Sequence, residues 1–323
     1  MKRIQINKGR PDPMLRFTMP EESSSFREKA DHVHSQLEEF LHMEALHELL
    51  GILETDIDTI SQRYNRRLKG NGAVVETQEL KGMKSLDEKK EILYPLFREL
   101  GFIDINKPIS DKNRHILVLG GSLNACIERT ECALNRVDDT TRLVDGLACY
   151  RPVSLAEKRA ADVFSCETEF GAMAESFERV FSLDGSGYTE NYKGDRNLNR
   201  ISCVRIYEGA DKCTFRIFAA PSSEPDVRRA DTGDSFSFVL DSDAKKEPAD
   251  HFLFITNNRY CNRQFLQLYY RMLQNRYPGT LDVIGCFPDD RVTSVEQYDP
   301  LQYLQDLIGI IDWTYRLLKA TGR

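Results

Sequence analysis

The segment HILVLGGSLNACIERTECAL, residues 115–134, decides the fold class of this chain. Apolar residues at 116–119 run directly into Gly120 and Gly121, and a proline-free segment that favours a helix follows at once. An uninterrupted apolar run is typical of a strand buried on both faces of a parallel sheet. Glycine pairs are typical of the tight connection between a strand and the next element. We therefore predict an inner strand at 115–119 and a helix that begins after Ser122.

The remainder of the chain repeats this alternation of short apolar runs and helical segments. The pattern predicts further strands at 141–150, 201–208, 213–221, 251–256 and 281–286. It predicts further helices at 167–181, 232–243, 260–275 and 299–319. Strands that alternate with helices indicate a mainly parallel sheet covered by helices on both faces. The predicted class is therefore an α/β fold of the Rossmann-like kind.

The N-terminal third has a different pattern, with no predicted strand. Residues 1–25 are polar and proline-containing and predict an irregular arm, and 26–67 carry leucines at helical spacing, typical of one long helix or two. After a loop at 69–82, Ser85 and Glu88 have the spacing of a capping box at the start of another helix. We predict an arm and all-helical extension at 1–110 and a Rossmann-like domain with a closing helix at 111–323.

Composition limits the function classes. The chain has 323 residues, 41% of them hydrophobic and 29% charged, with a formal charge of −7, which is typical of a globular protein without general affinity for nucleic acid. The cysteines form no Cys-x-x-Cys pair and the histidines have no zinc spacing, so we expect buried free thiols and no metal site. The sequence has neither a membrane-length apolar segment nor a signal-peptide pattern. We expect a cytoplasmic protein that contacts neither membrane nor nucleic acid.

The candidate site is expected at the carboxyl ends of the strands, because open α/β sheets bind ligands there, where the strand order reverses. The candidate ligand-binding residues at these strand ends and helix starts are Gly120, Gly121, Ser122, Arg129, Arg151, Glu169, Thr232, Asp234, Asn257 and Tyr260. In this hypothesis the residues after the first strand hold an anion through main-chain amides, and the two arginines neutralise it. Glu169 and Asp234 are the candidates for acid–base chemistry.

Each of these residues also has an ordinary structural interpretation. A Gly-Gly pair is equally a tight turn, a surface position is the commoner role for Arg129 or Arg151 taken alone, and a helix-start role is the ordinary one for Glu169 and Asp231. The segment lacks both Gly-x-Gly-x-x-Gly and Gly-Lys-Ser/Thr, which disfavours dinucleotide binding and P-loop chemistry. No Ser-His-Asp or Cys-His arrangement is recognisable.

Taken together, these motifs resemble the bacterial YdcF/SanA/ElyC-like family of domains of unknown function. The resemblance covers about residues 115–290. It rests on the order of short matches, which are Gly120 and Gly121, Arg129, Arg151 and Pro152, Thr168, Glu169 and Met173, Asp231, Thr232 and Asp234, and Thr256, Tyr260, Arg263 and Gln264. Two positions depart from the family pattern: Asp231 replaces an asparagine, and Tyr260 stands where a histidine is frequent. The resemblance implies a Rossmann-like fold, and through one relative it also implies S-adenosylmethionine binding.

Three functional hypotheses follow. The leading one is a protein that binds a small nucleotide-like or phosphorylated ligand, with hydrolase or transferase chemistry left open. The alternative is a non-catalytic sensor or interaction module whose N-terminal helices form a partner or homodimer surface. A third is an S-adenosylmethionine-dependent protein, which needs an acidic residue at the end of the second strand, where Arg151 lies instead. Catalysis requires Glu169 and Asp234 to converge, with at least one carboxyl pKa raised.

Overall fold

A computed structural model provides the three-dimensional structure of the chain. It describes residues 15–20, 24–65, 83–104, 108–109, 114–160, 164–208, 213–243, 251–286 and 298–321. The expected loop at 69–82 and most of the expected N-terminal arm lie outside these residues.

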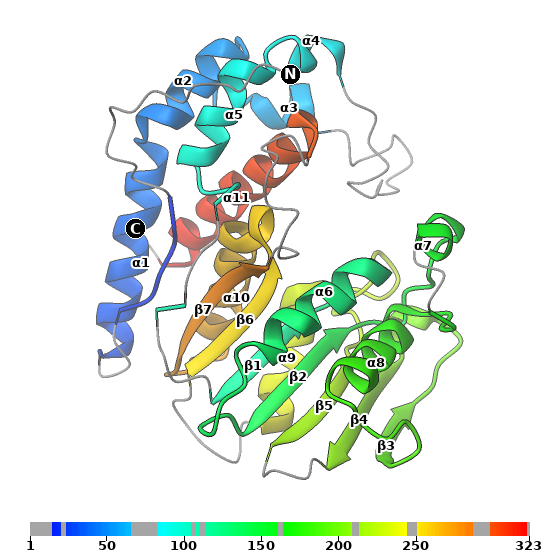
Figure 1. The fold of residues 1–323 in the computed structure, drawn as a ribbon. Coiled ribbons are helices and arrows are strands. Elements are labelled where there is room, and N and C mark those ends of the chain that lie inside the picture. Colours follow the sequence, from blue (N-terminus) through cyan, green and yellow to red (C-terminus); the bar gives the residue numbers. More distant parts are fainter. Residues whose placement is uncertain are drawn as a thin grey trace.

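A seven-stranded sheet in the order β3-β4-β5-β2-β1-β6-β7 forms the centre of the fold (Figure 1). The strands are β1 His115–Leu119, β2 Leu143–Ala148, β3 Tyr188–Lys193, β4 Ser202–Glu208, β5 Thr214–Ala219, β6 His251–Asn257 and β7 Thr280–Cys286. The five strands β5, β2, β1, β6 and β7 run parallel, and β3 and β4 extend the sheet as an antiparallel hairpin. The chain proceeds from β1 outward to β2 and β5, and then returns to β6 on the other side of β1. The strand order therefore reverses between β1 and β6.

Strand β1 is an inner strand, as predicted, and all five of its residues are buried. Its alternate residues belong to two cores: Ile116 and Val118 face the helices α6 and α8, while Leu117 and Leu119 face α9 and α10. These helices are α6 Leu123–Leu134, α8 Glu169–Val180, α9 Thr232–Asp243 and α10 Cys261–Gln274. The α/β fold with helices on both faces is thus confirmed. At Gly146 of β2 a side chain would collide with Met173, so glycine allows α8 to lie close to the sheet.

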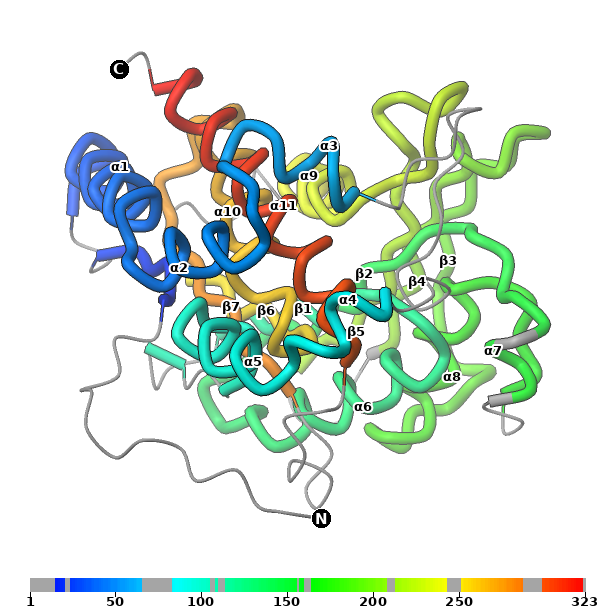
Figure 2. The backbone as a smooth tube through the Cα atoms, turned by 90° about the horizontal axis from the view of Figure 1, so that it is seen from above, coloured from blue at the N-terminus to red at the C-terminus, as the bar shows by residue number. Residues whose placement is uncertain are grey.

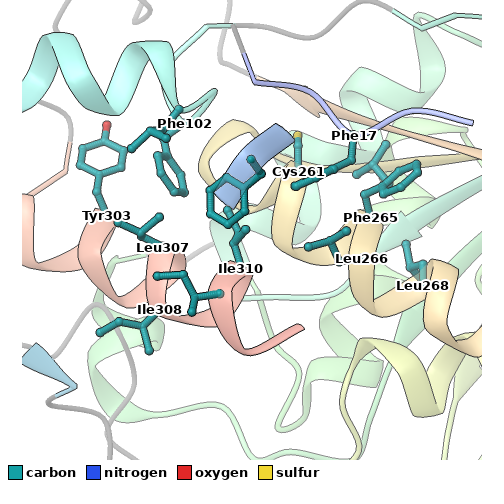
Figure 3. Close-up of a cluster of buried hydrophobic side chains, with 14 of the residues drawn as sticks. Phe17, Phe102, Cys261, Phe265, Leu266, Leu268, Tyr303, Leu307, Ile308 and Ile310 are labelled. Carbon is teal, nitrogen blue, oxygen red and sulfur yellow. The ribbon is translucent and has the colours of Figure 1, made fainter. Parts of the chain in front are cut away.

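The N-terminal part is helical and contributes no strand among its described residues. Its helices are α1 Phe26–Leu41, α2 Glu44–Ile52, α3 Ile60–Tyr64, α4 Lys84–Asp87 and α5 Lys90–Glu99. They pack around the closing helix α11, Pro300–Ala320, and share one continuous hydrophobic core with α10, β6 and β7. Phe17, from the extended segment before α1, stacks on Phe265 of α10 with ring centroids 6.3 Å apart (Figure 3). The extension is therefore built into the core of the α/β unit.

Local helix boundaries differ from the sequence predictions in three places. The segment at 26–64 forms three helices rather than one or two, because turns follow His42 and Leu53. The capping box lies at Ser25 and Glu28, whereas Ser85 is inside α4. Four short elements were not predicted. They are strand β3, helix α7 (Leu155–Ala160) and the 3₁₀ turns Leu198–Arg200 and Asn258–Tyr260. Within the described ranges, none of the helices combines the length and apolarity needed to cross a bilayer.

A buried charged cluster lies within the sheet, on the face covered by α9. The carboxylate of Asp145, which is fully buried, accepts two hydrogen bonds from Arg216, at 2.7 and 2.6 Å, and lies 2.6 Å from Nε2 of His115. Burial by itself raises the pKa of Asp145, but the charges and hydrogen bonds of His115 and Arg216 together bring it below the ordinary 3.8. The carboxylate therefore stays ionised inside the fold.

The shared core predicts that the N-terminal helices and the sheet unfold together. Phe97 of α5 is fully buried and stacks on Tyr303 of α11 at 4.9 Å, so Phe97→Ala should lower the free energy of unfolding by about 3–5 kcal/mol. Urea titration followed by circular dichroism should show one shifted transition. The matched control is Ile92→Ala on the same helix, where the side chain is 51% exposed and little change is expected. Two separate transitions would contradict a shared core.

Removal of the buried carboxylate should destabilise the sheet. We expect Asp145→Asn to cost about 3–5 kcal/mol near pH 7, because the substitution breaks the buried ion pair with Arg216. Since the folded pKa is depressed, this contribution is present above the unfolded pKa of about 3.9 and is lost as pH falls through the lower folded value. Denaturant titrations should therefore show the gap between wild type and variant narrowing below about pH 4. Asp241→Asn, at an exposed position of α9, is the control, and an equal loss there would contradict the assignment.

Candidate functional site

A cleft of about 1470 Å³ lies at the carboxyl ends of the parallel strands, at the point where the strand order reverses. Its inner part is lined by the turns that follow β1, β2 and β6 and by the first turn of α6. Its outer part follows α10 and α11, and α10 packs against both α9 and α11 (Figure 2). This is the place where parallel α/β sheets bind their ligands.

The structure places nine of the ten predicted site residues around this cleft. They are Gly120, Gly121, Ser122, Arg129, Arg151, Glu169, Thr232, Asn257 and Tyr260. The first and last of them are separated by 140 positions in the sequence but come from adjacent strand ends. Whether they bind a ligand stays a prediction. The tenth residue, Asp234, does not line the cleft, because its carboxylate is held by Arg228 and Arg271.

The Gly-Gly corner is a site of close packing and not of unusual backbone conformation. Neither Gly120 nor Gly121 has a positive φ. A Cβ at Gly120 would lie 2.5 Å from Oε1 of Glu169 and 2.6 Å from the carbonyl of Leu147. Glycine is therefore needed at this position because the start of α8 and the end of β2 approach the main chain there.

Arg129 connects the two strands that flank the reversal point. Its side chain is only 2% exposed, and its guanidinium donates to the carbonyls of Leu119, at 2.6 Å, and Gly120, both at the end of β1. The same guanidinium donates through Nε and Nη2 to Oδ1 of Asn257, at the end of β6, with an Nε distance of 2.9 Å. Four of its five N–H groups are thus directed to protein atoms. Its main observed role is to hold the ends of β1 and β6 in register.

Arg151 is also held by the protein. Its guanidinium makes a two-point ion pair with Glu157, at 2.9 and 3.0 Å, and donates to the carbonyl of Gly121 at 2.7 Å. Its Nε lies 3.7 Å from Glu169. The side chain therefore lies against the Gly-Gly corner with its charge shared between two carboxylates.

Glu169 is the predicted acid–base residue that does lie in the cleft. It is the first residue of α8, and it is 8% exposed. Its Oε2 accepts a hydrogen bond from the thiol of Cys149 at 3.0 Å. Burial, followed by the nearby Glu169 carboxylate, raises the pKa of Cys149 well above its usual range. Cys149 is thus a protonated hydrogen-bond donor that orients Glu169, and its environment is not that of a nucleophilic thiolate.

Asp234 has a different position from the one predicted. It is 5% exposed, and its carboxylate binds Arg228 at 2.6 Å and Arg271 at 3.2 Å and accepts the amide of Asp231 at 3.1 Å. Burial acts to raise its pKa, but the hydrogen bonds, with that from Arg228 the strongest, lower it below 3.8 overall. The carboxylate is directed at the start of α9 and the two arginines. Glu169 and Asp234 therefore do not form a convergent acid–base pair.

The first turn of α6 presents main-chain amides to the cleft. Ser122 is its N-cap residue but makes no side-chain capping bond, and Ser122, Asn124 and Ala125 all line the cleft. By contrast, Thr168 caps α8 and Asp231 caps α9 through side-chain oxygens, at 3.1 and 2.9 Å. The N–H groups at the start of a helix have no partner within the helix and carry partial positive charge. At α6 these groups face the point where the strand order reverses.

A cationic cluster beside this point, formed by Arg259 and Arg263, is not among the ten predicted site residues. Arg259 is 2% exposed and lies over the rings of Tyr260, at 4.4 Å, and Tyr298, at 4.3 Å. Arg259 and Arg263 share the buried carboxylate of Asp306 of α11, at 3.3 and 3.1 Å. The signal for it was present, since Asp306 is an acidic residue inside the apolar run LQYLQDLIGII.

The cleft surface carries more positive than negative side chains. Eight arginines and five acidic residues line it, counted over the described part of the chain. Three further carboxylates, those of Glu157, Asp234 and Asp306, bind cleft arginines without lining the cleft themselves. Carboxylates behind the surface thus fix the guanidinium groups that face the space. Across the described residues, no cluster of three or more His, Cys, Asp or Glu side chains is arranged to hold a metal ion.

Comparisons with known proteins add no further constraint on this site. No family model matches the chain, and neither a curated protein nor a solved structure matches it. The resemblance to the YdcF/SanA/ElyC-like domains therefore remains a prediction that rests on the motifs alone.

Proposed function

We propose that this protein binds a small nucleotide-like or phosphorylated ligand in the cleft, with an anionic group at the start of α6. The observation that carries the proposal is the uncapped first turn of α6, which opens into an arginine-lined cleft at the reversal point. Main-chain amides and the helix dipole at such a position favour phosphate groups without any sequence-specific motif. This explains how a chain without a nucleotide fingerprint binds an anion.

The arginines support this proposal through their fixed positions. Arg263 is a cationic side chain available to a ligand, because it lines the cleft, is 20% exposed and shares Asp306 with Arg259. Two guanidinium groups against one carboxylate leave a net positive charge beside the cleft. A preorganised guanidinium adds a charge-assisted contact of about 1.5–3 kcal/mol to an anion.

Binding is favoured over carboxylate-pair catalysis. The hypothesis of acid–base chemistry required Glu169 and Asp234 to converge, with at least one pKa raised. Asp234 lies off the cleft and its pKa is lowered. We therefore propose a binding function, with Glu169, oriented by Cys149, as the carboxylate that contacts a donor group of the ligand. This is the chemistry of a ligand sensor or of one component of a transferase site.

The role of the main-chain amides of α6 in anion binding can be tested by giving the helix an N-cap side chain that occupies these amides. Ser122→Asp should supply an internal carboxylate to the first turn, raise stability by about 0.3–1 kcal/mol and abolish thermal stabilisation by inorganic pyrophosphate. Ser122→Asn caps the same amides without charge and should only weaken the effect. Thermal-shift titrations of wild type and both variants measure this. Unchanged pyrophosphate stabilisation in Ser122→Asp would overturn the proposal.

The cationic contribution can be tested at Arg263. Arg263→Ala leaves Asp306 paired with Arg259, so we expect little loss of unliganded stability. Pyrophosphate affinity, measured by calorimetric titration, should fall by roughly 10- to 100-fold. Arg27→Ala, which removes an 86% exposed guanidinium from α1, is the matched control and should leave affinity unchanged. Equal affinities for the two variants would contradict a role for Arg263.

A further inference from the structure

The cleft is larger than a phosphate group requires. At about 1470 Å³ it exceeds the range of roughly 300–1,000 Å³ that is common for small-ligand sites. The additional space lies along the outer part, where Gln264, Gln267, Arg271 and Gln274 line it from one face of α10. A second portion of the ligand therefore has a defined place, next to the phosphate position proposed above.

Two glutamines of this outer part have side-chain amides without adequate partners among the described residues. Gln267 is 8% exposed and takes part in no hydrogen bond between described residues, but its amide atoms are not among the buried unpaired ones, so they are open to the cleft. Gln264 is 7% exposed; its Nε2 has one long contact of 3.5 Å to Thr232, and its Oε1 has no partner among the described residues. Buried amides are ordinarily satisfied, since an unpaired one costs about 1–3 kcal/mol. Both residues line the cleft, so a ligand is the natural partner.

The charges of the outer part are compensated within the protein. Arg271 is paired with Asp234, which also binds Arg228. Arg316 lies over the ring of Trp313, at 5.0 Å, and its charge acts on Asp312 one turn earlier in α11. Apart from Arg263, which is assigned to the phosphate above, the groups that remain for recognition are neutral side chains that both donate and accept hydrogen bonds. This part of the cleft is therefore suited to a neutral polar group.

The aromatic rings of the cleft are already in contact with other side chains. Trp313 packs against Tyr270, at 5.4 Å, and under Arg316, while Tyr260 contacts both Arg259 and Arg263. A nucleobase binds by stacking on a ring face, and guanidinium groups already lie over Tyr260 and Trp313. A sugar requires adjacent donors and acceptors, which two amides three residues apart on a helix supply at a Cβ separation of about 5–6 Å.

We propose that the outer part of the cleft, formed by Gln264 and Gln267 of α10, binds the hydroxyl groups of a sugar attached to the phosphate. The ligand class is thus a sugar phosphate or a nucleotide-linked sugar. This inference rests on the proposed function, because the phosphate group positions the sugar against α10.

The test compares inorganic phosphate, ribose 5-phosphate, glucose 1-phosphate and AMP by calorimetric titration. At least one sugar phosphate should bind wild type about tenfold more tightly than inorganic phosphate, as expected for two added hydrogen bonds. Gln267→Leu should remove this difference and leave the affinity for inorganic phosphate unchanged. Gln62→Leu, at an exposed position of α3, is the matched control and should behave as wild type.

Each other outcome overturns a specific part of the argument. If wild type binds inorganic phosphate and both sugar phosphates equally, the sugar site is overturned and the proposed function stands. If Gln267→Leu weakens inorganic phosphate as much as the sugar phosphates, Gln267 does not contact a sugar. If AMP binds tenfold more tightly than ribose 5-phosphate and loses this in Gln267→Leu, the amides contact a base instead. If none of the probes binds, the proposed function and the sugar site are both overturned.

Discussion

The geometry of the cleft depends on the guanidinium of Arg129. A charged side chain that is 2% exposed is costly unless its donors are satisfied, and here two main-chain carbonyls of β1 and the amide oxygen of Asn257 satisfy them. Carbonyl groups at the end of a strand need hydrogen-bond donors where the hydrogen bonds of the sheet stop. The guanidinium supplies these donors, and the oxygens at the two strand ends in turn satisfy its N–H groups. The bonds reach across the point where the strand order reverses, between the neighbouring parallel strands β1 and β6. They fix β1 and β6, and with β1 they fix the start of α6.

A similar logic governs the other arginines of the site. Glu157 binds Arg151, and Asp234 binds both Arg228 and Arg271. Asp306 binds both Arg259 and Arg263. Buried ion pairs add little net stability, because desolvation offsets much of the attraction. Their effect is to limit the rotamers of long side chains, so less conformational entropy is lost when a ligand arrives. The carboxylates thus belong to the site although they do not line it.

The sequence was sufficient for the sheet and insufficient for the roles of the polar residues. Buried strands leave apolar runs or alternating patterns that can be recognised locally, and β1, β2, β4, β5, β6 and β7 were found in this way. Strand β3 was missed because all six of its side chains are exposed, so no alternation marks it. The strand-end rule located the cleft, since it depends only on strand direction. The same rule could not show that Arg129 donates its hydrogen bonds to main-chain carbonyls or that Asp234 binds two arginines. These contacts depend on how the side chains pack in the folded chain, which the local sequence does not reveal.

The inner and outer parts of the cleft differ in what they leave unsatisfied, and this difference is the strongest guide to the ligand. In the inner part the unsatisfied groups are amides of an uncapped helix start, which are donors only and lie in a positive dipole field. In the outer part they are side-chain amides, which both donate and accept, among charges that already have partners. A single anion is suited to the first set and does not reach the second. A molecule that joins an anionic group to a hydroxyl-bearing one, as proposed, is suited to both.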